Sequence, residues 1–106
     1  MVPPKAKVRQ FQPDLYNGRW ELSTFSVDGL DDASKWGLMD LHSDKPVVAK
    51  SELATSDVTV AGLLLAPDWD PERHVNLLGW PDTEDGRKSM AQVLHAKQRF
   101  VLRPAA

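Results

Sequence analysis

The sequence predicts an α+β fold, with a small mixed β-sheet of three to five strands and two or three helices packed on it. Three observations support this prediction. The chain has 106 residues, of which 42% are hydrophobic and 26% charged, and these values are typical of one globular domain. Residues 74–80 alternate as a strand does, and residues 81–99 carry the apolar spacing and end charges of a helix.

The chain is predicted to begin with a flexible basic arm, residues 1–13, followed by a single α+β domain, residues 14–106. The arm is rich in proline and carries three basic residues and no acid, a composition that is common at loose termini. Val8 and Phe11 are its candidate docking residues. Residues 19–27, after a turn signal, predict a strand that is either bulged or covered on both faces.

The middle of the chain predicts a helix, a strand and one ambiguous segment. Residues 27–42 have helical apolar spacing, with Asp28 or Asp31 as the N-cap. Residues 47–53 predict a short strand. Residues 55–63 fit a short helix capped by Ser56, but residues 58–66 fit one strand equally well, and the local pattern leaves both interpretations open.

The last third of the chain gives the clearest signals. In the strand at residues 74–80, alternation places His74, Asn76 and Trp80 on one face, and Gly79 indicates a bulge or a close backbone approach. The next helix is capped by Asp82 with Asp85 or by Thr83 alone. Its predicted buried stripe consists of Met90, Val93, Leu94 and the stem of Lys97, with Ala91 beside it. The final residues predict an edge strand that Pro104 ends.

Several classes of protein are excluded or disfavoured by what the chain lacks. It has no cysteine, which excludes disulfides, thiolate nucleophiles and thiolate metal sites. It has no nucleophile elbow and no glycine-rich phosphate loop. Because Pro67 and Pro71 favour an acidic turn over an extended metal site, we predict no metal and no cofactor. No apolar segment is long enough to span a membrane, and we expect a cytoplasmic protein.

The candidate binding residues are Trp69, Arg73, His74, Asn76 and Trp80. Four tryptophans are many for a chain of 106 residues, and a small domain cannot bury them all, so an exposed indole indicates a binding surface. Trp69, in the polar turn, is the first candidate. The favoured prediction is therefore a non-enzymatic interaction or accessory protein that binds a protein partner.

Two other functions remain open. The first is a small nucleotide- or metal-handling enzyme in which His74 acts as acid and base, Asn76 orients the substrate, and Asp68 or Asp70 assists. The second is nucleic-acid binding through the basic ends of the chain, which flank an acidic middle. The sequence does not predict the oligomeric state.

Residues 74–81, His-Val-Asn-Leu-Leu-Gly-Trp-Pro, resemble an element of the form H-(A/V)-N-(I/L)-x-G-W-P in small uncharacterised bacterial proteins. In that family a helix rich in lysine, glutamine and alanine follows the element, as it does here. Residues 49–53 and 58–63 are loosely similar to the same family. The resemblance implies a bacterial or phage-borne cytoplasmic protein and draws attention to His74, Asn76 and Trp80. It implies no particular activity.

Overall fold

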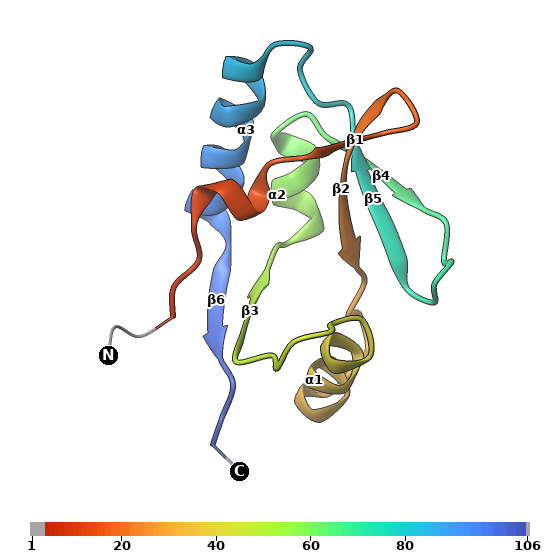
Figure 1. Ribbon diagram of the computed structural model, residues 1–106, viewed down its shortest axis with the longest axis vertical. Helices are drawn as coiled ribbons and strands as arrows, with labels where there is room; N and C mark the ends of the chain where they lie inside the picture. Colours follow the sequence, from red (N-terminus) through yellow and green to blue (C-terminus); the bar gives the residue numbers. More distant parts are fainter. Residues whose placement is uncertain (1–3, 106) are drawn as a thin grey trace.

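The structure, a computed structural model, describes residues 4–105 and confirms the α+β class (Figure 1). Within these residues lie three α-helices, six strands and one 3-10 helix. In chain order they are η1 (Val8–Phe11), β1 (Asp14–Tyr16), β2 (Arg19–Phe25), α1 (Asp32–Leu41), β3 (Ala49–Glu52), α2 (Thr55–Val60), β4 (Leu64–Pro67), β5 (His74–Leu78), α3 (Glu84–Lys97) and β6 (Arg99–Leu102).

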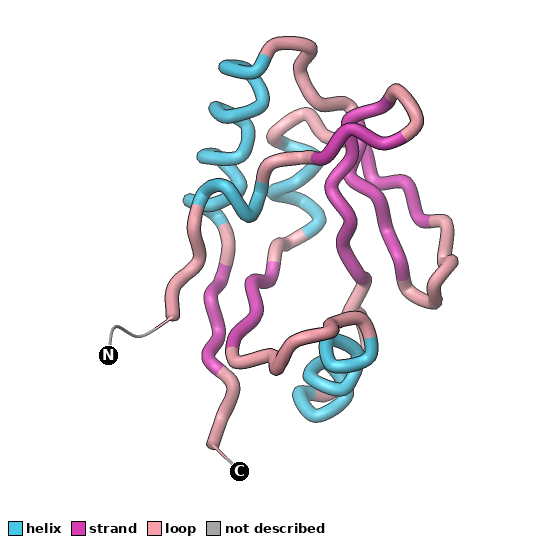
Figure 2. The backbone as a smooth tube through the Cα atoms, in the orientation of Figure 1, coloured by secondary structure: helices cyan, strands magenta, loops and turns pink. Residues whose placement is uncertain are grey.

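The strands form two separate antiparallel sheets. The larger has the order β1-β2-β5-β4, and the smaller pairs β3 with β6. Figure 2 shows the two groups of strands apart from each other. The sequence predicted one mixed sheet, but every pairing among the described residues is antiparallel. Tight connections explain this for β1–β2 and β4–β5, because short loops return the chain along its neighbour.

The first hairpin depends on two residues with left-handed backbone. Asn17 and Gly18, between β1 and β2, have φ angles of 51° and 76°. Positive φ at both central residues is the requirement of a type I′ turn, which suits the twist of paired strands. The predicted turn at this position is therefore confirmed.

The ambiguous segment contains both a helix and a strand. Residues Thr55–Val60 form α2, Gly62 reverses the chain with φ 102°, and Leu64 begins β4. Ser56 was predicted as the N-cap, which is wrong, because Ser56 is the second residue of the helix; the N-cap is Ala54, two positions earlier, and no side chain caps the helix. In α1 the cap is Asp31, whose carboxylate accepts a hydrogen bond from the Ser34 N–H at 2.8 Å.

Helix α3 is capped by Thr83, whose hydroxyl accepts from the Gly86 N–H at 3.0 Å. Its buried positions are Ala91 and Leu94, each 0% exposed, whereas Val93 is 44% exposed. The predicted stripe was thus wrong at Val93. The reason is that η1 packs on the opposite side of α3, where the Phe11 ring meets His95 edge to face at 5.8 Å.

The hydrophobic core lies where α2, α3 and η1 meet the large sheet (Figure 1). Its buried members are Phe11, Val58, Leu63, Leu77, Trp80, Ala91 and Leu94. Of the arm predicted at residues 1–13, the first three residues lie outside the described part of the chain. Within the rest, Phe11 is in the core and Val8 packs against it.

The protein exposes more surface than its mass predicts. Its accessible area is 7304 Å², whereas a compact monomer of 11.8 kDa exposes about 5,900 Å². The radius of gyration is 14.0 Å, against about 13 Å for a compact domain of this length. The fold is therefore open. Among residues 4–105, no helix has both the length and the apolar character needed to cross a membrane.

Candidate functional site

The loop between β4 and β5, residues 68–73, is held in a fixed shape by His74. The N–H groups of Asp68 and Trp69 both donate to the His74 carbonyl, at 3.3 and 3.2 Å, and the His74 N–H donates to Pro71 O at 2.9 Å. Trp69 and Arg73 have φ angles of 54° and 69°. Left-handed backbone is unfavourable for these residue types, so the surrounding hydrogen bonds must enforce it.

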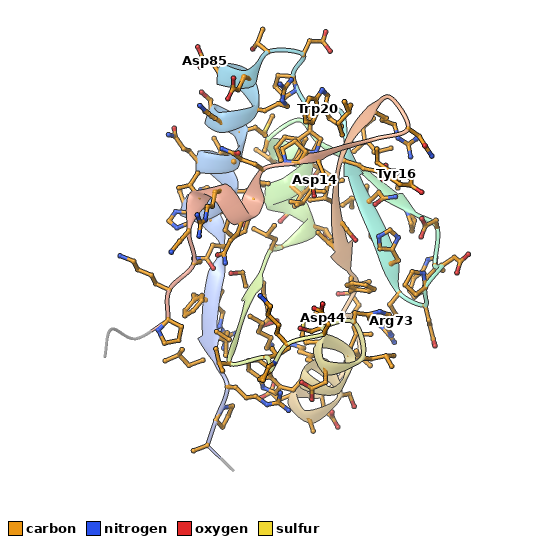
Figure 3. All side chains as sticks on the ribbon, viewed as in Figure 1. Asp14, Tyr16, Trp20, Asp44, Arg73 and Asp85 are labelled. Carbon is orange, nitrogen blue, oxygen red and sulfur yellow. The ribbon has the colours of Figure 1, made fainter. Side chains whose placement is uncertain are left out.

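This loop presents Trp69 to solvent. The Trp69 side chain is 50% exposed, and the Arg73 guanidinium lies 6.0 Å from the centre of its ring. Arg73 also donates to the carbonyls of Ser26 and Asp28, at 3.3 and 3.1 Å. Figure 3 shows Arg73 directed from the loop toward α1. Arg73 therefore ties the loop to the segment after β2.

His74 is the centre of a hydrogen-bonded chain of three side chains. Its Nε2 lies 2.6 Å from Ser23 Oγ, and its Nδ1 lies 2.8 Å from Asp68 Oδ1. The hydrogen bond from the Asp70 N–H to Asp68 Oδ1 lowers the pKa of the Asp68 carboxyl, and the bond from His74 lowers it further. Since an ionised carboxylate only accepts, Nδ1 donates to Asp68, and in the neutral ring Nε2 accepts from Ser23.

Asn76 and Trp80 lie away from Trp69 and Arg73. Asn76 is 8% exposed and pairs with Ser23 across β2 and β5. Trp80 is 7% exposed, in the core, and its indole N–H donates to Leu77 O at 2.8 Å. Alternation predicted Trp80 on the face of His74. That is wrong because Gly79, with φ 85°, ends the alternation and turns Trp80 inward.

No group of three or more histidine, aspartate or glutamate side chains in residues 4–105 is arranged to hold a metal ion. Of the four side chains that alternate from Asp68 to His74, the two end members hydrogen-bond each other. Pro71 lies in the turn between them. These four residues therefore belong to the turn and its ends, and Asp68 is held by its hydrogen bond to His74.

A cleft of about 910 Å³ lies between the two sheets. It is bounded by β2 and the segment after it, by α1, by β3 and the start of α2, and by parts of β4 and β5. Trp69 is among the residues that line it. Its apolar lining residues include Phe25, Val27, Met39, Leu53, Leu65 and Val75. The volume falls in the range of ligand-binding sites, roughly 300–1,000 Å³.

The wall of the cleft around β3 is basic. Glu52 accepts hydrogen bonds from Lys35 at 3.1 Å and from Lys50 at 3.0 Å. Burial raises the pKa of the Glu52 carboxyl, but these two lysines outweigh burial and hold the pKa below its ordinary value. Lys97 and Arg99, from the end of α3 and the start of β6, line the same cleft. Cations therefore exceed carboxylates on this wall.

Sequence reasoning missed Ser23, Lys50 and Glu52. Ser23 is 51 residues from His74, and no local pattern reveals such a contact. Lys50 and Glu52 lie on a short strand whose partner, β6, ends near residue 102. The Lys50 and Glu52 pair was visible in the sequence, but the second base, Lys35, is 17 residues from Glu52, and the position of the three side chains in a cleft depends on the separation of the two sheets.

Comparison of the chain with protein-family models, with curated proteins and with solved structures finds no match.

Proposed function

We propose that the protein is a non-enzymatic, cytoplasmic interaction module that binds a protein partner in the cleft between its two sheets. The observation that supports this most strongly is the cleft of about 910 Å³ itself. Apolar side chains line it, and the molecule has more exposed surface than a compact monomer of its mass. Apolar surface of this kind is usually covered by a partner.

The predicted binding residues take different roles in this proposal. Trp69 is the contact residue, since it is both half exposed and part of the cleft lining. Partly exposed tryptophans often supply a large share of binding energy. Arg73 and His74 hold the loop in shape. Asn76 and Trp80, which are buried, support the strand from within.

The test is site-specific photo-crosslinking in cells, followed by reconstitution. A photoreactive amino acid at Val27, which lines the cleft, should give a discrete crosslinked protein. The same group at Val93, an exposed position on α3 outside the cleft, is the control and should not.

With the recombinant partner, Trp69→Ala should weaken binding at least about tenfold, while Tyr16→Ala, at an exposed aromatic residue elsewhere, should leave it unchanged. Equal effects of the two variants would reject the proposal.

A second candidate function rests on the hydrogen-bonded chain Ser23, His74 and Asp68. In ester hydrolysis, Ser23 Oγ would attack the carbonyl carbon while His74 Nε2 takes its proton, and Asp68 would stabilise the imidazolium. His74 would return the proton to the leaving alcohol, and water would then release the acid. This extends the alternative in which His74 serves as acid and base.

A fluorophosphonate probe distinguishes this candidate from a structural hydrogen-bond chain. An activated Ser23 should be labelled stoichiometrically, with labelling lost in Ser23→Ala and strongly reduced in His74→Ala. Ser51→Ala, at an exposed serine on β3, is the matched control. If the parent protein is not labelled, the three side chains only fix the loop to β2.

Nucleic-acid binding through the basic ends stays a third proposal with less support. Arg87 stacks on Trp20, and Arg103 is paired with Asp40. Two of the basic residues after Gly86 are therefore already engaged in contacts within the fold. A duplex that binds at low salt and is released steeply as salt rises would favour this proposal.

A further inference from the structure

Strand β2 has an unpaired edge that begins where β1 stops. β1 pairs with β2 as far as Glu21. On the other side, the Ser26 N–H donates to Arg73 O at 2.8 Å, and the antiparallel register continues from this pair along β5. Because hydrogen-bonding directions alternate along a strand, the N–H and C=O groups of Ser23 and Phe25 are directed away from β5. In residues 4–105 no strand pairs with them.

Strand β3 has an unpaired edge of the same kind. The Arg103 N–H donates to Val48 O at 2.8 Å, which fixes the phase of the β3–β6 ladder. By the same alternation Lys50 and Glu52 bond to β6, while the N–H and C=O of Ser51 are directed to the opposite side. In the described chain β3 has β6 as its sole strand partner.

The two unpaired edges belong to one cleft. Ser23 and Phe25 of β2 and Ser51 of β3 all line it, and Figure 1 shows β2 and β3 facing each other with no other strand drawn between them. Backbone groups in partly apolar surroundings need hydrogen-bond partners, and a strand edge is completed best by another strand. A compact small molecule cannot satisfy the regular row of donors and acceptors on both sides.

We propose that an extended segment of a partner protein enters this cleft as a β-strand between β2 and β3 and joins the two sheets into one. This inference rests on the proposed function and specifies how the partner is bound. The chain runs in opposite directions along β2 and β3 (Figure 1). The added strand is therefore antiparallel to one neighbour and parallel to the other.

The charges of the cleft specify the chemistry of that segment. Lys35 and Lys50 share the single carboxylate of Glu52, and Lys97 and Arg99 stand on the same wall. Two further carboxylates, Asp28 and Asp57, also line the cleft, so four cations stand against three carboxylates, and most of the other lining residues are apolar. The segment that fits has apolar residues alternating with carboxylates, since successive side chains of a strand point to opposite faces.

The experiment uses a tethered probe, because tethering compensates for modest affinity. A short strand of alternating valine and glutamate is joined to Ala106 by a Gly/Ser linker of about 20 residues, which spans roughly 25 Å on average. Backbone hydrogen exchange is then followed by NMR. The amides of Ser23, Phe25 and Ser51 should become at least about tenfold better protected than in the untethered protein. Unchanged protection at these amides would overturn the inference.

Two matched controls examine the backbone and the charge separately. Lysine in place of glutamate in the probe should remove most of the protection, and proline at alternate positions should remove all of it, since proline has no N–H to donate. If the lysine probe protects the same amides equally, the acidic partner assigned here is wrong.

Ser51→Pro tests the edge of β3 directly. It removes the N–H directed into the cleft and leaves the donors that bond to β6 in place. The protection that the tethered strand gives to the amides of Ser23 and Phe25 should then fall at least about tenfold. Ser51→Ala, which keeps the N–H, should retain this protection. Should Ser51→Pro not fold, the proline probe on the unchanged protein gives the same information.

The failure of this inference can be told apart from the failure of the proposed function. If Val27 crosslinks to a partner whose binding needs Trp69, but the amides of Ser23 and Ser51 exchange freely in that complex, the interaction module stands and strand insertion is wrong. If the same amides become protected only as the untethered protein dimerises, the occupant is a second copy of this chain and the partner assignment is overturned.

Discussion

The guanidinium of Arg87 lies 3.8 Å from the centre of the Trp20 ring. Trp20 is on β2, near β1 and beside α3 (Figure 3), so this contact joins the start of α3 to the large sheet. Arg87 also donates to the carbonyls of Pro81 and Asp82, at 3.1 and 2.8 Å. One side chain thus fixes the turn before α3 and its position against β2.

Replacing Arg87 should destabilise the fold. We expect Arg87→Ala to lower the free energy of unfolding by about 1–2 kcal/mol, because a stacked cation and two hydrogen bonds are lost. Arg87→Lys should recover less than half of this, since an ammonium does not stack as a planar guanidinium does. Urea unfolding measures both values. Lys88→Ala, which removes an exposed pair with Glu84, should change stability by less than about 0.5 kcal/mol.

The two helical glycines should respond to alanine with opposite signs. At Gly86 an added Cβ would lie 2.7 Å from Pro81 Cβ and 2.8 Å from Thr83 Oγ1, so the capping turn has to shift. Gly86→Ala should therefore cost about 1–3 kcal/mol despite its better helix propensity. At Gly37, in α1, nothing lies within 4 Å of the added atom, and Gly37→Ala should stabilise by about 0.4–1 kcal/mol. Thermal unfolding of the two variants gives the comparison, and equal signs would contradict it.

Adjacent residues of α3 should differ sharply in their effect on the core. Leu94 is 0% exposed, whereas Val93 is 44% exposed. Leu94→Ala should cost about 2–5 kcal/mol, because it leaves a cavity between α3 and η1. Val93→Ala should stay within about 0.5 kcal/mol. A large loss of stability in Val93→Ala would instead indicate that Val93 is buried, as the sequence predicted.

Stability should fall in acid through a surface ion pair. Arg103 bonds both oxygens of Asp40, at 2.7 and 2.9 Å, and the hydrogen bond from Arg103 lowers the pKa of the Asp40 carboxyl. A carboxyl with a lowered pKa in the folded state stabilises it above the pKa of the unfolded chain, near 4. That stabilisation is lost as the pH falls through the lower folded-state pKa.

The measurement for this pair is the urea midpoint between pH 6 and pH 3, in a double-mutant cycle. Asp40→Asn and Arg103→Gln should each flatten the fall of the midpoint in acid, and the double variant should flatten it no further. If the double variant shows the sum of both effects, the two residues act separately and the ion pair does not cause the dependence.

The sequence predicted local elements correctly where the residues that determine an element are close together in the chain. Thr83 caps α3, Asp31 caps α1, and Asn17 with Gly18 forms the first turn. In each case a side chain or backbone preference acts within a few residues. The strand at His74 and the α+β class followed for the same reason.

The site could be predicted only in part because it depends on distant contacts. Trp69 and Arg73, both predicted as binding residues, lie together in a loop, but Trp80 is in the core because Gly79 ends the alternation of the strand. One of the two side chains bonded to His74 is Ser23, on a strand that only the sheet order brings near. The cleft lies between two separate sheets because β3 pairs with β6 and not with the large sheet, and no local sequence pattern predicts that pairing.

The separation of the two sheets also affects how the protein unfolds. Helix α1 packs on the small sheet, since Trp36 lies against Arg103 and the Asp40 carboxylate is held by Arg103. Its contact with the large sheet is at its C-cap, where the His42 ring stacks on Phe25 of β2 at 4.3 Å. The large sheet holds most of the core with α2, α3 and η1. The unbound chain should therefore open in two steps, as two cooperative units of unequal stability. A strand that bridged them would make the two units open as one, so that occupancy of the cleft could be read from the number of unfolding transitions.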